Sequence, residues 1–128
     1  MSRIRSKNTE PEMIVRRLLH AMGVRYRLHR DALPGKPDIV LGSRRLVIFV
    51  HGCFWHRHPG CRGATMPAAN RDFWQAKLEG NAARDLLHRA ALRKLGWRVA
   101  VIWECETRQP EKLARRLARL TGSVLPAL

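Results

Sequence analysis

Apolar residues recur at helical spacing in three parts of the chain. In residues 8–23 they fall three or four positions apart on one face, and Thr9 and Glu12 have the spacing of a capping box at the start of that helix. Residues 71–96 and 109–122 show the same periodicity, and each segment ends at a glycine, which favours helix termination. The pattern therefore predicts three helices, of which the middle one is the longest.

Four shorter segments have the pattern of β-strands. Residues 24–29 alternate between apolar and polar, whereas 38–41 and 45–51 are mostly apolar and are separated by a short turn that begins Gly-Ser, which is typical of a hairpin. Residues 97–104 read as a buried strand after the long helix, and such a helical crossover favours a parallel pairing with 45–51. The order of elements predicts an α/β fold in which a mixed central sheet is flanked by helices.

The length of 128 residues and a hydrophobic fraction of 45% are sufficient for a single domain, 1–128, with one core. The charge of the chain says more about its function than its length does. Lys and Arg number 25 against 10 Asp and Glu, which gives a formal net charge of +15. A field of this sign attracts phosphate backbones, so the composition favours a nucleic-acid-binding protein. A ribosome-associated protein, a merely cationic surface and binding to an anionic membrane surface are the alternatives.

Three features of the sequence bear on the cellular setting. No apolar run approaches the roughly 20 residues that a membrane-spanning helix needs, and the polar, basic first residues do not have the pattern of a signal peptide. We therefore expect a cytoplasmic protein. The cysteines number three, and an odd number of thiols in a reducing compartment argues against a disulfide framework.

The loop HGCFWHRHPGC, residues 51–61, combines three histidines, two cysteines and a Phe-Trp pair. Cys53 follows one predicted strand and Cys105 follows another, so a parallel pairing of those strands brings both thiols to the same edge of the sheet. Together with Cys61 they provide three of the four thiolate and imidazole ligands that structural Zn²⁺ prefers. The fourth would be one of three loop histidines: His51, His56 or His58. The alternative is that Cys105 is a buried, inert thiol.

Asp38 stands out among the few carboxylates because it begins an apolar strand, where an aspartate costs strand propensity and desolvation. A carboxylate at the edge of a hairpin is well placed to hold Mg²⁺ against a phosphate group. A turn aspartate that closes the segment PGKPD is the alternative. Glu12 has a sufficient role in the capping box, with a second role open if its helix covers the sheet edge. Asp85 is expected on a solvated helix face or in a cap.

The large aromatic residues near the loop divide between surface and core. Phe54 and Trp55 stand beside candidate metal ligands in a polar loop, so we expect them to be exposed. Phe73 is expected to pack beneath the long helix. Its neighbour Trp74 then points elsewhere, because adjacent helical residues diverge by roughly 100°.

Five segments occur in order over about residues 3–120: SRIRSKNTEPE, LPGKPDIV, VIFVHGCFWHRHPGC, FWQAKLEGN and GWRVAVIWEC. Together they resemble the very short patch repair (Vsr) mismatch endonucleases. The resemblance implies a restriction-endonuclease-like α/β fold with a structural zinc and with Mg²⁺ as the catalytic metal. It also implies an enzyme that nicks one DNA strand 5′ to the T of a T:G mismatch. Such mismatches arise when 5-methylcytosine deaminates in the target of a cognate cytosine-5 methyltransferase.

The resemblance assigns the catalytic roles by position. Asp38 matches the metal-binding aspartate of the family, and the main-chain carbonyl of Val50 matches its second protein ligand for Mg²⁺. Better-known members have threonine at the second position, a departure that matters little if only the carbonyl binds the metal. His56 matches the histidine that activates the attacking water, Glu12 the acid that supports it, and His51 a second active-site histidine.

The resemblance also assigns the zinc ligands and the residues that face DNA. The matching zinc ligands are Cys53, His58, Cys61 and Cys105, with His58 in a stretch spaced slightly differently from that of the best-known member. The residues that match the aromatics wedged into the base stack are Phe54, Trp55 and Trp74. Lys77 and Asn81 follow Trp74 on the same helical face and match residues near the mismatch, for which a solvated helix face is the alternative.

Two other functions stay open at this point. A non-catalytic, zinc-stabilised module that binds mismatched DNA would lack metal-dependent nicking, and a restriction enzyme of the same fold would cut both strands of paired DNA. The expected substrate is double-stranded DNA with a T:G mismatch. A nucleoid-associated monomer suffices for it, because a single-strand nick needs only one active site. Mismatch-repair proteins are possible partners that could recruit the enzyme, a point that the sequence leaves open.

Overall fold

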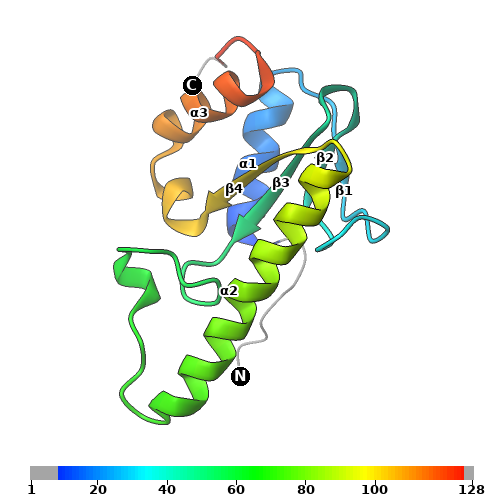
Figure 1. The fold of residues 1–128 in the computed structure, drawn as a ribbon. Coiled ribbons are helices and arrows are strands. Elements are labelled where there is room, and N and C mark those ends of the chain that lie inside the picture. Colours follow the sequence, from blue (N-terminus) through cyan, green and yellow to red (C-terminus); the bar gives the residue numbers. More distant parts are fainter. Residues whose placement is uncertain (1–8, 126–128) are drawn as a thin grey trace.

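The central sheet has four strands within residues 9–125, the part of the chain that this computed structural model describes. The strands are β1 (Arg27–Leu28), β2 (Ile39–Leu41), β3 (Leu46–His51) and β4 (Arg98–Trp103), in that order across the sheet (Figure 1). β1 and β2 pair antiparallel, as do β2 and β3, whereas β3 and β4 pair parallel. The predicted hairpin and the predicted parallel pair are both confirmed.

The first predicted strand is much shorter than its alternating pattern suggested. Of residues 24–29, only Arg27 and Leu28 pair with β2. The next residue, His29, has a φ of 48°, in the left-handed region that interrupts an extended strand. The prediction of a six-residue strand was therefore wrong in extent: residues 24–26 do not pair with β2, and the strand ends before the left-handed His29.

Helices cover both faces of the sheet, as predicted. α1 (Glu10–Ala21) and α3 (Pro110–Thr121) lie on one face, and α2 (Arg71–Lys94) lies on the other (Figure 1). At the start of α1 the Thr9 Oγ1 accepts a hydrogen bond from the Glu12 N–H at 3.4 Å. This is the predicted cap, and it leaves the Glu12 carboxylate available for other partners.

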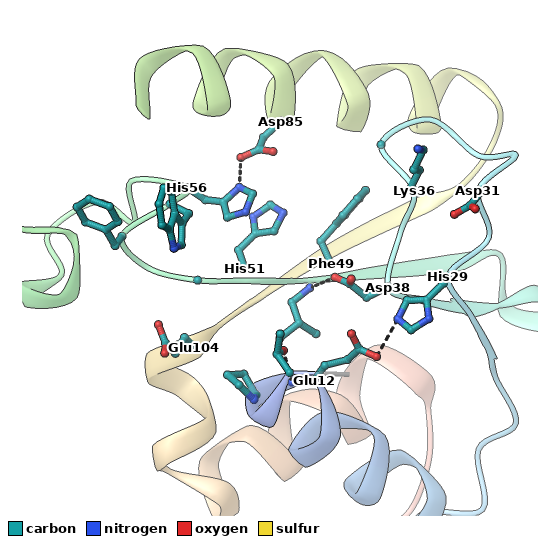
Figure 2. A pocket seen from close by; sticks show the side chains of 17 residues that line it. Glu12, His29, Asp31, Lys36, Asp38, Phe49, His51, His56, Asp85 and Glu104 are labelled. Atoms are coloured by element: carbon teal, nitrogen blue, oxygen red, sulfur yellow. Dashed lines mark hydrogen bonds and ion pairs between the residues drawn. The ribbon is translucent and has the colours of Figure 1, made fainter. Parts of the chain in front are cut away.

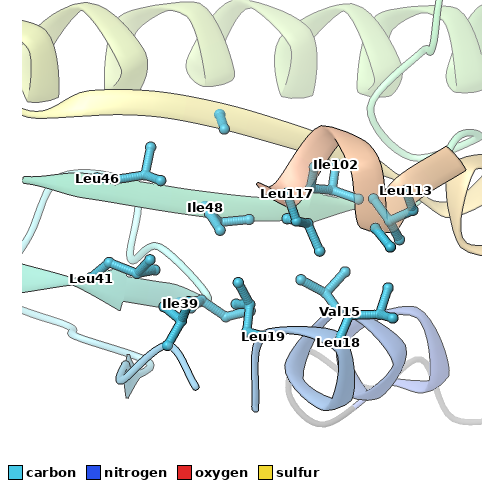
Figure 3. Close-up of a cluster of buried hydrophobic side chains, with 13 residues drawn as sticks. Val15, Leu18, Leu19, Ile39, Leu41, Leu46, Ile48, Ile102, Leu113 and Leu117 are labelled. Carbon is cyan, nitrogen blue, oxygen red and sulfur yellow. The ribbon is translucent and has the colours of Figure 1, made fainter. Parts of the chain in front are cut away.

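The core has two parts, one on each face of the sheet. The larger cluster joins α1 and α3 to the sheet, and it includes Leu19, Ile48, Ile102 and Leu117, which are fully buried (Figure 3). The smaller cluster lies under α2 and contains Leu92 with side chains of β2 and β3. Successive residues of β3 alternate between the two clusters, as the period of a strand requires. Burial on both faces fixes the register of the strands and thus the positions of their ends.

The carboxyl ends of β3 and β4 meet at one edge of the sheet, where His51 is opposite Trp103. The loop 52–70 begins at this edge, and α2 extends past it, so that loop and helix lie together beyond the sheet (Figure 1). The Asn81 side chain donates a hydrogen bond to the main-chain oxygen of Trp55 at 3.0 Å, which ties the loop to the helix. Residues far apart in sequence are thereby gathered at this edge.

Within residues 9–125, no helix combines the length and the apolar character needed to cross a membrane. Residues 3–8 of the first resembling segment lie outside the described part of the chain.

Candidate active site and metal centre

A cleft of about 730 Å³ opens at the edge of the sheet, between the start of α1, the end of β3 and the middle of α2 (Figure 2). The structure gathers in it the four residues that the resemblance named as catalytic, together with carboxylates that it did not name, of which Asp85 contacts one of the four. These lining residues are Glu12, Asp38, His51, His56 and Asp85. The cleft is therefore the candidate active site.

Asp38 precedes β2 and points across to β3. Its Oδ2 accepts a hydrogen bond from the Val50 N–H at 2.7 Å. Burial raises the pKa of Asp38 to about 6, although the Val50 hydrogen bond works in the opposite direction. A strand residue directs its N–H and its C=O to the same side, so the Val50 carbonyl faces the side on which the Asp38 carboxylate lies. A buried, poorly compensated carboxylate beside a carbonyl oxygen fits a hard divalent cation.

Glu12 is 1% exposed although it belongs to the first turn of a helix. Its Oε2 lies 3.0 Å from Nε2 of His29 and 3.6 Å from Nη1 of Arg16. The resemblance assigned Glu12 to support His56, but in the structure its imidazole partner is His29. Sequence reasoning gave His29 no role. The nearest sequence signal was its position at the end of an alternating segment that faces the cleft.

The carboxylate that contacts His56 is Asp85. Its Oδ2 lies 2.6 Å from the His56 Nδ1. Burial by itself would raise the pKa of Asp85, but the hydrogen bond and the charge of His56 outweigh it, so the net pKa is lowered. Asp85 is thus an ionised, half-buried partner of an imidazole, and its expected place on a solvated face was wrong. The sequence did contain a signal for this contact. Asp85 lies one helical turn after Asn81, on the same helix face as Trp74.

His51 lies beneath His56 and is 6% exposed. The two imidazole rings stack with their centroids 3.8 Å apart and their planes within 6°. Burial, together with the nearby charge of His56, lowers the pKa of His51 to about 3. His51 is therefore neutral at physiological pH. Its Nδ1 is buried and has no hydrogen-bond partner among the described residues.

A second cluster lies on the other side of Trp103. Its ligand atoms all lie within 4.8 Å of one another, and its members are Cys53, His58, Cys61 and Cys105. Cys53 follows β3 and Cys105 follows β4, so the predicted convergence of the two thiols is confirmed. Of the three histidine candidates for the fourth ligand, only His58 lies here. Cys105 is only half-buried and lies beside the other three possible ligands, which does not fit the alternative of a buried thiol on its own.

The thiol cluster has the character of a metal site. Burial raises the pKa of Cys53 to about 12, so a thiolate there needs a compensating cation. Gly63 approaches so closely that an added Cβ would lie 3.2 Å from the Cys53 Cβ. Trp103 joins this cluster to the cleft, since it stacks on His58 with centroids 4.2 Å apart and meets His51 edge-on at 5.4 Å. A metal ion in the cluster would thus help to fix the active-site imidazoles.

Three aromatic side chains form a cluster at the mouth of the cleft. Phe54, Trp55 and Trp74 meet edge to face, with ring centroids 5.1 to 5.8 Å apart. They are half-buried rather than fully exposed. Phe73 contacts Trp74 at 5.2 Å but is 60% exposed, so the prediction that it packs beneath α2 was wrong. Lys77 is exposed on the same helix, whereas Asn81 holds the loop.

Comparison with known proteins gives consistent results. The sequence model of the family described as DNA mismatch endonuclease Vsr matches residues 1–62. The chain is 56% identical over 120 residues to the type II nicking enzyme V.XorIIP of Xanthomonas oryzae pv. oryzae, with 94% of this chain and 88% of the relative covered. It is 41% identical to the type II nicking enzyme V.NmeAIP of Neisseria meningitidis over 100% of this chain and 91% of the relative. It is also 42% identical to the DNA mismatch endonuclease Vsr of Escherichia coli, covering 88% and 72%.

Proposed function

The chain belongs to the Vsr family of DNA mismatch endonucleases, whose fold is restriction-endonuclease-like, and from this premise we propose that it nicks one strand 5′ to the T of a T:G mismatch. The observation that carries the proposal is the cleft. The half-buried Asp38 carboxylate, the Asp85–His56 pair and an aromatic cluster lie close together there. These groups support hydrolysis of a phosphodiester at an unstacked base, because a cation, a general base and an aromatic wedge each contribute to it.

His56 is the general base in this proposal. Asp85 holds the Nδ1 of the ring, which leaves Nε2 free to accept a proton from the attacking water. As the imidazole becomes positively charged, the Asp85 carboxylate stabilises it and keeps the ring in one orientation. The stacked, neutral His51 supports the ring from below. Glu12 then acts through His29 and the cation site rather than through His56.

Mg²⁺ is the proposed catalytic cofactor. The Asp38 carboxylate and the Val50 carbonyl would hold it, and the contact between these two residues supports the assignment. When bound, the ion offsets the negative charge that develops on the phosphate during cleavage. The raised pKa of Asp38 fits this role, because a buried carboxylate without a cation is costly to ionise.

Zn²⁺ is the proposed occupant of the second cluster. Three cysteines and one histidine are a common tetrahedral ligand set for structural zinc. The loop 52–70 contains few aliphatic residues, so the four bonds would supply the rigidity that burial does not.

Phe54, Trp55 and Trp74 are the proposed wedge. Unstacking a base step costs a few kcal/mol and costs least at a mismatch, so inserted aromatic rings select mismatched sites. Lys77, exposed on the same helix, is placed to contact the DNA backbone. The net charge of +15 supplies attraction that does not depend on sequence.

The biological setting follows from this substrate. A T:G mismatch produced by deamination of 5-methylcytosine makes a cytosine-5 methyltransferase the genetic partner, and its target sets the flanking sequence. We propose a single-domain monomer that acts on chromosomal DNA in the cytoplasm, because one strand is cut by one active site. Mismatch-repair proteins are candidate partners in recruitment. Very short patch repair is the process that the nick would start.

The test is a strand-specific nicking assay on a labelled duplex with one T:G mismatch, in several cytosine-methylation contexts. Zinc-loaded protein is expected to cut 5′ to the T with Mg²⁺ and to leave the fully paired duplex intact. Cleavage of both strands of paired DNA would indicate a restriction enzyme instead. Tight mismatch binding without cleavage in any context would support a non-catalytic binding module.

The Asp85→Asn variant should separate the positioning of His56 from the binding of mismatched DNA. We expect the single-turnover nicking rate at pH 7 to fall by about 100-fold or more, because an amide neither stabilises the charged imidazole nor secures its tautomer. The affinity for mismatched duplex should change by less than about threefold, since Asp85 is turned toward His56. The matched control is Asp72→Asn, an exposed aspartate in the first turn of α2, which should keep the wild-type rate. An Asp85→Asn enzyme with normal kinetics would refute the assigned role.

A further inference from the structure

Three potential metal ligands meet at the inner end of the cleft. One of them, His29, has so far been described only as the partner of Glu12. Glu12, His29 and Asp38 bring one donor atom each to within 4.8 Å of one another (Figure 2). Glu12 belongs to α1, His29 directly follows β1, and Asp38 directly precedes β2. The three residues are separated in sequence, so the sequence alone does not reveal that they meet.

The spacing of these donors is compatible with a single ion, as well as with the hydrogen bond that His29 and Glu12 make with each other. His29 Nε2 lies 3.0 Å from Glu12 Oε2. Two adjacent ligands of an ion with bonds of about 2.1 Å are about 3 Å apart when they subtend a right angle. The Glu12 side chain is 2% exposed and that of His29 is 16% exposed, so the donors are sheltered from bulk water while the cleft remains open beside them.

Both the backbone and the side chain of His29 are held in place. Its φ of 48° is unfavourable for a residue with a Cβ, and its N–H donates a hydrogen bond to the main-chain oxygen of Asp38 at 3.0 Å. The same conformation ends β1 and turns the imidazole toward Glu12. Strained backbone of this kind often marks a functional site. Here it fixes a nitrogen donor directly beside two buried carboxylates.

We propose that His29 is a further protein ligand of the divalent cation site, together with Glu12 and beside the Asp38 carboxylate and the Val50 carbonyl. This inference rests on the proposed cation role of Asp38. An imidazole contributes little to Mg²⁺, which prefers oxygen, but it favours later transition ions such as Co²⁺. The site should therefore bind Co²⁺ more tightly than Mg²⁺, with His29 responsible for most of the difference.

The other histidine-rich group in the cleft does not offer such a site. His51, His56 and Asp85 also lie within 4.8 Å of one another. The rings of His51 and His56 are stacked within 6° of parallel. The lone pairs of stacked rings lie in separate planes and do not converge on one ion. Among the described histidines of the cleft, His29 is therefore the one placed to join such a metal site.

The test measures metal binding in the absence of DNA. Protein whose cysteine cluster is saturated with Zn²⁺ is titrated calorimetrically with Co²⁺ and, separately, with Mg²⁺. We expect His29→Gln to weaken Co²⁺ binding by about tenfold or more while Mg²⁺ binding changes by less than about threefold. The control is His20→Gln, an exposed histidine of α1, which should bind both ions as wild type does. Equal loss for both ions, or no loss for Co²⁺, would overturn the proposal.

Two further measurements guard against exchange of Co²⁺ for Zn²⁺ in the cysteine cluster and against misfolding of the His29→Gln variant. The Co²⁺ absorption spectrum must lack thiolate charge-transfer bands, which shows that Co²⁺ has not replaced Zn²⁺ among the cysteines. The wild-type preference for Co²⁺ over Mg²⁺ can be measured even if His29→Gln does not fold, and its absence would count against the inference. The titration involves no nicking. The metal-binding result therefore stands even if the protein proves not to be a nuclease, and a failed metal-binding result would leave the nicking assay unaffected.

Discussion

Replacing Asp38 with alanine is expected to abolish nicking while leaving binding to mismatched DNA measurable. The carboxylate is the charged protein ligand of the proposed Mg²⁺, whose contribution to phosphate cleavage is several kcal/mol. Each 1.36 kcal/mol corresponds to a factor of ten, so the rate should fall by at least about 1,000-fold. The measurement pairs a single-turnover nicking assay with an electrophoretic binding assay. Joint loss of binding and activity would contradict a purely catalytic role for Asp38.

The isosteric variant Asp38→Asn should be inactive and also more stable at neutral pH without Mg²⁺. The pKa of Asp38 is raised from 3.8 to about 6, so the folded protein holds this proton more tightly than the unfolded chain does. Stability from this group is therefore full below pH 3.8 and is lost as pH rises through about 6. At pH 7.5 the ionised carboxylate costs up to about 3 kcal/mol, which the amide would recover.

Thermal unfolding at several pH values tests this expectation. The midpoint of Asp38→Asn should exceed that of wild type at pH 7.5, and the difference should shrink toward pH 4. Addition of Mg²⁺ should raise the midpoint of wild type but not that of the variant. Asp31→Asn is the control, because Asp31 lies exposed at the rim of the same cleft. A variant that is less stable than wild type at neutral pH would show that burial of the carboxylate is compensated in another way.

Replacing Cys105 with serine is expected to remove the structural metal and, with it, both stability and activity. Binding of zinc to such sites is worth about 10–16 kcal/mol in small zinc-folded peptides, so loss of one thiolate has a large effect. The effect should reach the active site because Trp103 lies between His58 and His51. We expect a zinc content well below one ion per chain, a lower unfolding midpoint, rapid proteolysis within residues 52–70 and a nicking rate reduced by about 100-fold or more.

Thr65→Ala provides the comparison within the same loop. Thr65 donates a hydrogen bond to the main-chain oxygen of Arg62 but is not a member of the thiol cluster. This variant should keep its zinc, its resistance to proteolysis and its rate. If Cys105→Ser lost zinc yet retained wild-type nicking, the proposed support of the active-site histidines by the metal site would be wrong.

The sequence by itself determined the elements of the fold and much of the chemistry. Periodicity located all three α-helices of the described chain, because apolar faces repeat at fixed intervals wherever a helix packs on a sheet. The crossover through the long helix predicted the parallel pair, which in turn predicted that Cys53 and Cys105 would meet. Strand ends at one edge of a sheet are neighbours whatever the details of packing, so topology was sufficient.

Only the tertiary structure decided which side chains are partners. His56 meets Asp85, 29 positions later, and Glu12 meets His29, 17 positions later. The choice between such partners depends on how far α2 extends past the sheet, on the path of a loop and on one left-handed residue. Local patterns of polarity fix which face of a helix is apolar, but they leave open which residue of the polar face meets another element. The exposed position of Phe73 and the pairings of Asp85 and Glu12 depend on where the helices and strands lie relative to one another, although the sequence had already predicted those helices and strands.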